Sequence, residues 1–270
     1  MNELYNTAAE VVAKALRGLG LSPATVAGEA GVELEAMGAF LQGRAEPGTA
    51  RPLALPLGLD PDALASFNDP PAPIELPADI RRIELPFEDE TVNAWSIDGG
   101  SSLLVIDAGF GPEDLARRLP KDRTVDLLIT HPHRDHLGGL EAVRGLHRLR
   151  APVDLREAVV VQPGDEFEAA GRRISVMDLA GHHPQAVGYR IGGFDHPVVA
   201  VGDAVFARSI GGCPGPDAYR RARATIVGTL ADLPDETILL TGHGPATTLG
   251  RERMENPFLA VWLSGGDAGP

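Results

Sequence analysis

The sequence predicts an α/β protein in which a small all-α domain precedes a larger domain of mixed strands and helices. Residues 1–68 carry apolar side chains at helical spacing, interrupted by glycines. A proline-rich segment follows at 69–77 and is typical of a stiff linker. Residues 78–270 alternate β-prone runs with helical segments, which indicates a sheet covered by helices. The length of 270 residues allows one large and one small domain.

The helices of the first domain are marked by their start and stop signals. A Ser-Pro pair is a good N-cap and first-turn combination, and a glycine after the last apolar residue ends a helix. These signals place helices at 8–19, 22–31 and 33–42, and a further one from residue 60 onward.

This helix spacing resembles the helix-turn-helix bundle of phage-repressor-type regulators. A DNA-reading helix normally presents basic or amide side chains. The stretch from Ser22 to Gln42 contains Glu29, Glu33 and Glu35 and no Lys or Arg, so phosphate groups would repel it. We therefore expect a degenerate bundle that forms a homodimer or shapes the mouth of an active site, with a DNA-binding regulator as the alternative.

The elements of the second domain follow from β-prone runs and from one clear amphipathic segment. Strands are expected at 80–87, 92–97, 102–106, 125–129, 158–161, 173–177, 188–191, 198–201 and 237–241. Helices are expected at 115–119, from 139 to about 146, and at 218–230.

Composition narrows the class of partner. The formal net charge of -14 disfavours nonspecific binding to nucleic acid or to an anionic membrane. The sequence contains no apolar run long enough for a spanning helix, and Met1–Tyr5 does not begin a secretory signal. Cys213 is the only cysteine, which excludes an internal disulfide and favours a small buried side chain. We expect a cytoplasmic protein that acts on a small molecule.

Three histidines and one aspartate lie within the six residues that follow Thr130, directly after an apolar run that is typical of a buried strand. Side chains two residues apart on an extended chain point the same way, so His131 and His133 can bind one ion together. Asp135 and His136 come where the chain turns into a helix, so they can serve a neighbouring ion. The segment therefore predicts a metal site.

This motif resembles the HxHxDH signature of the metallo-β-lactamase fold hydrolases. Members of that family take a further His from a Gly-His loop, an Asp from a strand end and a last His from a Gly-His-Gly turn. The sequence supplies these in order as His182, Asp203 and His243. The resemblance covers roughly residues 78 to 260, and it implies an αββα sandwich with the metal site at one edge between the sheets.

The resemblance also implies a ligand set for two divalent metal ions. The first ion would take His131, His133 and His182, the second would take Asp135, His136 and His243, and Asp203 would bridge both. Three imidazoles suit zinc, with iron or manganese as alternatives, and a shared carboxylate offsets repulsion between dications roughly 3.5–4 Å apart. A metal-bound hydroxide would be the nucleophile. The expected catalytic residues are Asp135, which would orient or deprotonate the attacking water, and His131, His133, His182 and Asp203.

Other residues of the same types receive structural interpretations. Asp107 also ends an apolar run, and by the resemblance it bonds to loop backbone near the metals. His183 follows a predicted ligand directly and is expected to line the pocket or to support a ligand. His147 and His196 are expected on the surface or in packing contacts.

The C-terminal third is similar to the glyoxalase II-like branch. Residues 202–212 follow its GDxLFxxSIGR pattern and 242–258 follow its GHGPxTTxGxER…NPF pattern. The resemblance implies hydrolysis of a thioester or ester of the hydroxyacylglutathione type. Two departures affect the substrate: the chain ends 27 residues after His243, without the C-terminal helical domain of that branch, and Gly212 replaces its Arg.

An alternative from the same branch is an iron-dependent persulfide dioxygenase. Its single iron would be held by His131, His182 and Asp203, a facial triad suited to ferrous iron and dioxygen. Both enzyme types carry the two-metal motif, so this pattern favours neither.

Overall fold

A computed structural model describes residues 6–44, 48–67, 70–155 and 157–264. The first five residues and the expected domain boundary at 68–69 lie outside these ranges. The helical segment comprises α1 (Ala8–Leu19), α2 (Pro23–Ala30), α3 (Leu34–Leu41), α4 (Ala50–Ala54), the 3-10 turn η1 (Leu55–Leu57) and α5 (Pro61–Ala65). None of the helices in the described ranges is long and apolar enough to cross a lipid bilayer.

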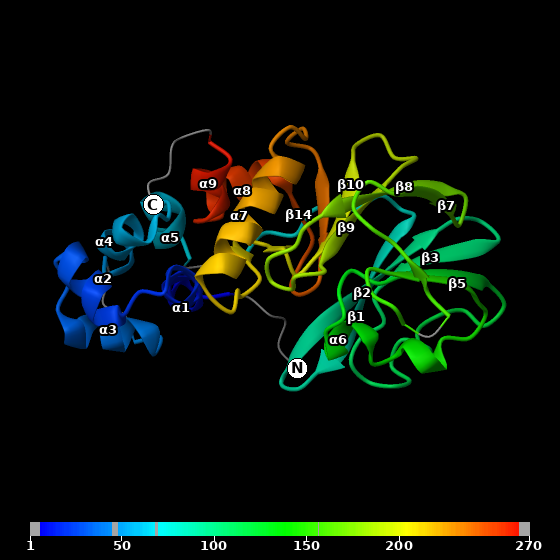
Figure 1. The fold of residues 1–270 in the computed structure, drawn as a ribbon, viewed down its shortest axis with the longest axis horizontal. Helices are drawn as coiled ribbons and strands as arrows, with labels where there is room; N and C mark the ends of the chain where they lie inside the picture. Colours follow the sequence, from blue (N-terminus) through cyan, green and yellow to red (C-terminus); the bar gives the residue numbers. More distant parts are fainter. Residues whose placement is uncertain (1–5, 45–47, 68–69, 156, 265–270) are drawn as a thin grey trace.

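Two six-stranded sheets face each other in the remainder of the chain (Figure 1). The first sheet has the order β1-β2-β3-β4-β5-β6 and the second has the order β14-β13-β10-β9-β8-β7. The strands of the first sheet are β1 (Ile80–Phe87), β2 (Glu90–Asp98), β3 (Ser102–Ile106), β4 (Thr124–Leu128), β5 (Leu146–Ala151) and β6 (Val159–Val160). The second contains β7 (Glu166–Ala169), β8 (Arg172–Asp178), β9 (Val187–Ile191), β10 (Val198–Gly202), β13 (Ile238–Thr241) and β14 (Thr247–Thr248), and a separate hairpin pairs β11 (Val205–Phe206) with β12 (Ser209–Ile210).

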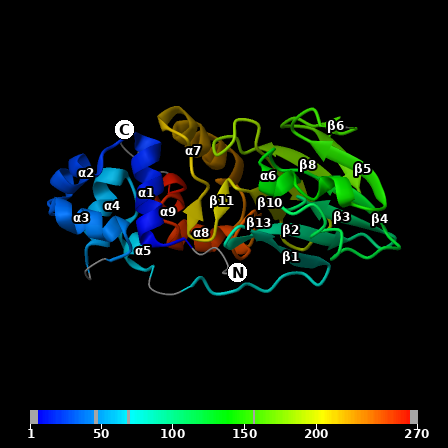
Figure 2. The ribbon, with the colours of Figure 1, turned by 90° about the horizontal axis from the view of Figure 1, so that it is seen from below.

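Helical segments cover both outer faces, which confirms the predicted αββα sandwich with helices at its N-terminal side (Figure 2). Between the sheets, Trp95 and Tyr189 belong to the apolar core. The outer face of the first sheet is covered around α6 (Arg134–Leu137) and the 3-10 turn η2 (Leu140–Ala142). The outer face of the second is covered by α7 (Pro216–Leu230), α8 (Leu249–Glu255) and α9 (Leu259–Trp262).

The N-terminal helices share one apolar core with α7, α8 and α9. On α1, Val11, Val12 and Leu16 are buried in this core. Gly18 lies directly against Tyr219 of α7, where an added Cβ would come within 2.4 Å of the ring. A glycine is needed for so close a contact, and the contact holds α1 beside the sandwich.

Two predicted helices are wrong, and several strands were not predicted. The segment at 112–118 forms turns rather than a regular helix, and the predicted helix at 139–146 is replaced by η2 and the start of β5. The left-handed φ of 70° at Gly145 breaks the helix, and the chain then pairs in parallel with β4. Strand β7, which pairs with the adjacent β8, was also missed, as were the two-residue strands β11, β12 and β14. Strand formation depends on packing against neighbouring strands, which local patterning does not specify.

Candidate metal centre

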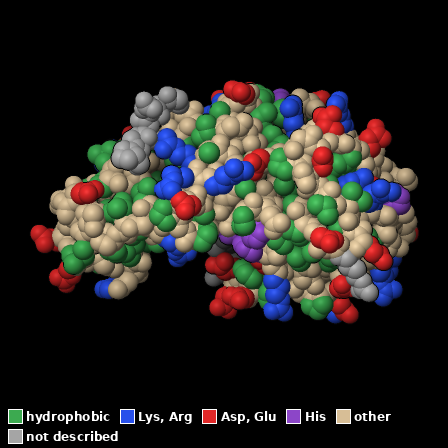
Figure 3. Space-filling view, in the orientation of Figure 1, with side chains coloured by type: hydrophobic (Ala, Val, Ile, Leu, Met, Phe, Trp, Pro, Cys, Tyr) green, Lys and Arg blue, Asp and Glu red, His purple; other side chains and the backbone are tan. Residues whose placement is uncertain are grey.

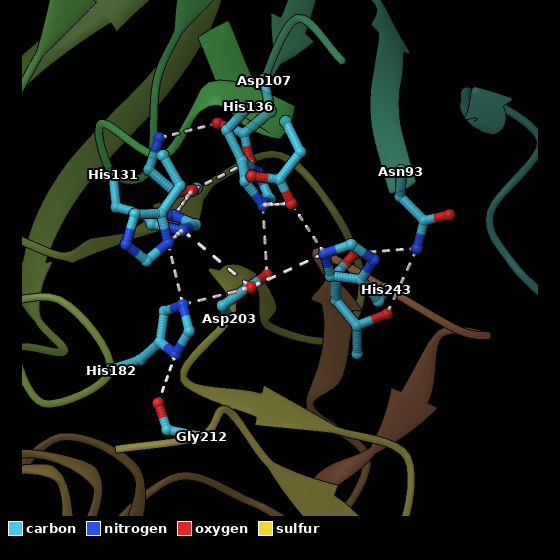
Figure 4. Close-up of polar contacts among 12 residues, drawn as sticks. Asn93, Asp107, His131, His136, His182, Asp203, Gly212 and His243 are labelled. Carbon is cyan, nitrogen blue, oxygen red and sulfur yellow. Dashed lines mark hydrogen bonds and ion pairs between the residues drawn. The ribbon is translucent and has the colours of Figure 1, made fainter. Parts of the chain in front are cut away.

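Three histidine side chains converge at the edge of the sandwich (Figure 4). His131 follows β4, His133 precedes α6, and His182 lies in the loop between β8 and β9. His131 Nε2 lies 3.1 Å from His133 Nδ1, and His182 Nε2 lies 3.0 Å from that same atom. Three ring nitrogens that face one another at these distances form a set of donors for one cation.

A second group of donors adjoins the first. Asp135 and His136 lie on α6, Asp203 follows β10, and His243 follows β13, and their ligand-type atoms lie within 4.8 Å of one another. Asp203 faces both groups, because its Oδ1 lies 3.3 Å from His136 Nε2 and its Oδ2 lies 3.5 Å from His182 Nε2. The structure thus brings all seven sequence-predicted donors together.

Glycines before two of these donors allow the loops to approach closely. Gly202 has a φ of 49°, and an added Cβ there would lie 2.6 Å from Thr130 Oγ1. At Gly242 an added Cβ would lie 2.0 Å from Asp203 Oδ1. Because β10 and β13 run parallel, their carboxyl ends bring these loops to the same edge. The Gly-Asp and Gly-His pairs of the sequence are therefore steric requirements of the site.

Asp107 forms hydrogen bonds to Thr130 and to His136 of the cluster. Its Oδ1 accepts the backbone N–H of Thr130 at 2.8 Å, and its Oδ2 accepts the Thr130 hydroxyl at 2.8 Å. His136 Nδ1 donates to the same Oδ2, also at 2.8 Å. The predicted structural role of Asp107 is confirmed, because it fixes the end of β4 and turns His136 Nε2 toward the cluster.

Two further imidazoles are oriented by backbone carbonyls. His182 Nδ1 donates to the Gly212 carbonyl at 2.7 Å, and His243 Nδ1 donates to the Thr91 carbonyl at 2.8 Å. A carbonyl can only accept, so Nδ1 of each ring carries a proton, and Nε2 of each ring faces the cluster.

Sequence reasoning missed Asn93, a buried amide in an otherwise apolar stretch of β2. Its Nδ2 donates to the Thr241 carbonyl at 3.0 Å and to the Gly244 carbonyl at 2.7 Å, so it holds the turn that carries His243 (Figure 4). A polar amide inside a β-prone run was the available signal.

The electrostatics of the cluster fit divalent cations. His136 Nε2 and Asp203 Oδ1 are buried and lack a hydrogen-bond partner, an arrangement that is costly unless an ion occupies the space between them. Burial lowers the pKa of His131 well below its usual value, which keeps that imidazole neutral. Burial alone would raise the pKa of Asp203, but the positive charges of His243 and His136 hold it well below its usual value. The neutral imidazole of His131 and the ionised carboxylate of Asp203 are donors of the kind that such ions require.

The remaining predicted residues lie outside the two donor groups. His183 packs its ring edge-on to His133, with ring centroids 5.2 Å apart. His147 and His196 are exposed, as expected. Cys213 is buried, and this burial raises its pKa to about 11, which confirms its interpretation as a small buried side chain.

A pocket of about 490 Å³ opens over the cluster, within the size range of small-molecule sites. It is lined on one side by donors such as His133, Asp135 and His243, and on the other by residues of α1. In Figure 3, histidine side chains gather near the middle of the visible face, beside the indentation between the helical end and the sheet end of the molecule.

Comparison with known proteins gives concordant results. The family model described as the metallo-β-lactamase superfamily matches residues 88–159. An uncharacterized protein of Mycobacterium leprae is 31% identical over 200 residues, which cover 59% of this chain and 88% of that protein. The hydroxyacylglutathione hydrolase GloC of Haemophilus influenzae is 27% identical over 195 residues, covering 60% of this chain and 89% of that protein. The crystal structure of the BLEG-1 B3 metallo-β-lactamase aligns with a TM-score of 0.54 and 26% identity, covering 66% of this chain and 99% of that one.

Fold and donor set together define a metallohydrolase. The chain carries a metallo-β-lactamase superfamily domain.

Proposed function

We propose that this protein hydrolyses a small thioester or ester at a pair of divalent metal ions, with zinc as the expected metal. The observation that carries this proposal is the assembly of seven donors into two groups that share Asp203. The similarity to the hydroxyacylglutathione hydrolase GloC supports a thioester as the scissile group.

The donors divide between two sites. His131, His133 and His182 would hold one ion, Asp135, His136 and His243 would hold the other, and Asp203 would contact both. When bound, such ions polarise a carbonyl and lower the pKa of water toward neutrality.

In this proposal, Asp135 would orient the attacking water and accept its proton. Its Oδ2 accepts a hydrogen bond from His243 Nε2 at 3.1 Å, and its side chain lines the pocket. Burial alone would raise the pKa of Asp135, but the His243 hydrogen bond and the charge of His136 bring it below its usual value. The carboxylate is therefore ionised at neutral pH and available to orient a water molecule and accept its proton.

The alternative is a persulfide dioxygenase with a single iron. It would use only His131, His182 and Asp203 of the seven donors. Elemental analysis of protein purified without added metal distinguishes the two. Zinc at two ions per chain supports the hydrolase, whereas one iron per chain with oxygen uptake on glutathione persulfide supports the dioxygenase.

Two substitutions test the site directly. His133→Ala and Asp203→Asn should each abolish thioester hydrolysis, because each removes a donor, while the far-ultraviolet circular dichroism stays close to that of the wild type. His196→Ala is the matched control, since His196 is exposed and lies outside both donor groups. Wild-type turnover in either donor variant would refute the assignment.

A further inference from the structure

Helix α1 forms one wall of the pocket over the metal centre. Its residues at helical spacings of three and four face the pocket, namely Glu10, Ala13, Lys14 and Arg17. The opposite face of the helix is buried in the apolar core through Val11, Val12, Ala15 and Leu16. The amphipathic pattern of α1 therefore holds a charged face over the donor groups.

Lys14 anchors this wall to the sandwich. Its Nζ donates to the Ile210 carbonyl at 2.7 Å and to Ser209 Oγ at 3.1 Å, and it also bonds to Asn6 Oδ1. These three acceptors use all three protons of the ammonium group. Lys14 thus fixes α1 to β12 and has no proton left for a ligand.

Arg17, one turn further along α1, is the cation that remains available. Its side chain is exposed, and no described residue forms an ion pair with its guanidinium. It lies beside Gly212, where an added Cβ would be 3.8 Å from Arg17 Nη1 and would meet no other atom within 4 Å. The carbonyl of this same Gly212 orients His182, so the guanidinium stands next to a donor loop of the metal centre.

The other charged groups of the pocket are already engaged or are acidic. Asp135 and Asp203 belong to the donor groups, and Glu10 accepts the Thr7 backbone N–H in the capping box of α1. Glu90 is the remaining acid of the lining. A guanidinium presents donors in a planar fork that matches a carboxylate. Among the described residues of the lining, no other Lys or Arg side chain is free to bind one.

We propose that Arg17 determines specificity by binding a carboxylate of the substrate at the pocket mouth. This inference rests on the proposed hydrolysis and narrows its substrate class to thioesters or esters with a carboxylate away from the scissile bond. The helical segment thereby takes part in substrate binding. Arg17 lies beside Gly212, which is nearly two hundred residues later in the sequence.

The kinetic test uses zinc-loaded full-length protein and two matched pairs of thioesters. Within each pair, one substrate has a carboxylate and the other has a carboxamide at the same position. In the first pair this position is the far end of the acyl group, and in the second pair it is on the thiol. Arg17→Ala should raise KM about tenfold for the carboxylate member of one pair, with kcat and the KM of its carboxamide within about twofold of the wild type. Arg17→Lys should restore part of the loss.

Arg117→Ala is the matched control, because Arg117 is an exposed arginine with a surface ion pair to Glu113 and lies outside the pocket. It removes the same net charge and should leave all four KM values unchanged. Equal effects of Arg17→Ala on carboxylate and carboxamide substrates, or no effect on either, would overturn the proposal.

A binding measurement separates this inference from the reaction itself. Calorimetric titration of the zinc-loaded protein with glutarate should give a Kd about tenfold weaker for Arg17→Ala than for the wild type or for Arg117→Ala. If no thioester is hydrolysed but this difference is found, the proposed reaction fails and the carboxylate site stands. Equal glutarate binding by wild type and Arg17→Ala would reject the site even if thioesters are hydrolysed.

Discussion

Substituting Gly242 by alanine tests whether the position of Asp203 controls the metal centre. An added Cβ would lie 2.0 Å from Asp203 Oδ1, 2.9 Å from His136 Cε1 and 3.1 Å from the carbonyl carbon of Gly202. Relaxed non-bonded contacts are about 3.5 Å, so the carboxylate must move by roughly 1.5 Å. The backbone of Asp203 has little room to move, because it packs closely against Gly211. A Cβ added to Gly211 would lie only 1.9 Å from the carbonyl oxygen of Asp203.

The expected cost falls on metal binding and catalysis more than on folding. Overpacking of this kind destabilises a protein by about 1–3 kcal/mol. A displacement of about 1 Å in a catalytic array lowers turnover roughly 100-fold. We therefore expect Gly242→Ala to retain the fold, to lose bound zinc and to hydrolyse thioesters at least about 100-fold more slowly than the wild type.

The assay combines zinc content, thermal unfolding and thioester turnover. Gly228→Ala is the matched control, because Gly228 is exposed on α7 and an added Cβ there would meet nothing within 4 Å. It should stabilise the protein by about 0.5–1 kcal/mol without changing activity. Wild-type zinc content and turnover in Gly242→Ala would show that the position of Asp203 does not control metal binding and catalysis.

Two further predictions concern the support of the site. Asp107→Asn should weaken zinc binding about 10–100-fold in chelator competition, because an amide has only one acceptor oxygen. The carboxylate uses both, one for the Thr130 N–H and one for the Thr130 hydroxyl and His136 Nδ1–H, and an unchanged affinity would contradict this role. Burial raises the pKa of Glu252 from 4.5 to about 7, so the folded state holds a proton that the unfolded state releases. Its contribution to stability is complete below pH 4.5 and is lost as the pH rises through 7, by about 3 kcal/mol at most. Urea unfolding across this pH range should show that the free energy of unfolding changes less with pH in Glu252→Gln than in the wild type or in the exposed control Glu113→Gln. An equal pH dependence in Glu252→Gln would reject the assignment.

The donor residues were predictable because each lies in a short motif with a local reason. His131 and His133 alternate on extended chain after a buried strand, and the glycines before Asp203 and His243 permit close loop contacts. Local patterning did not predict β5: the helix expected at 139–146 gives way to a left-handed turn at Gly145, after which the chain pairs in parallel with β4. Asn93 escaped notice because its partners, around Thr241, are 148 residues away.

By itself, the sequence determined which side chains can serve as metal donors and in what order they occur, since donor chemistry and strand-end spacing are local properties. Only the tertiary structure decided that Asp203 faces both donor groups and that α1 lies over the pocket. The reason is that both depend on packing between distant segments: Gly18 allows α1 to contact Tyr219, and Lys14 bonds to Ile210, 196 residues further along the chain.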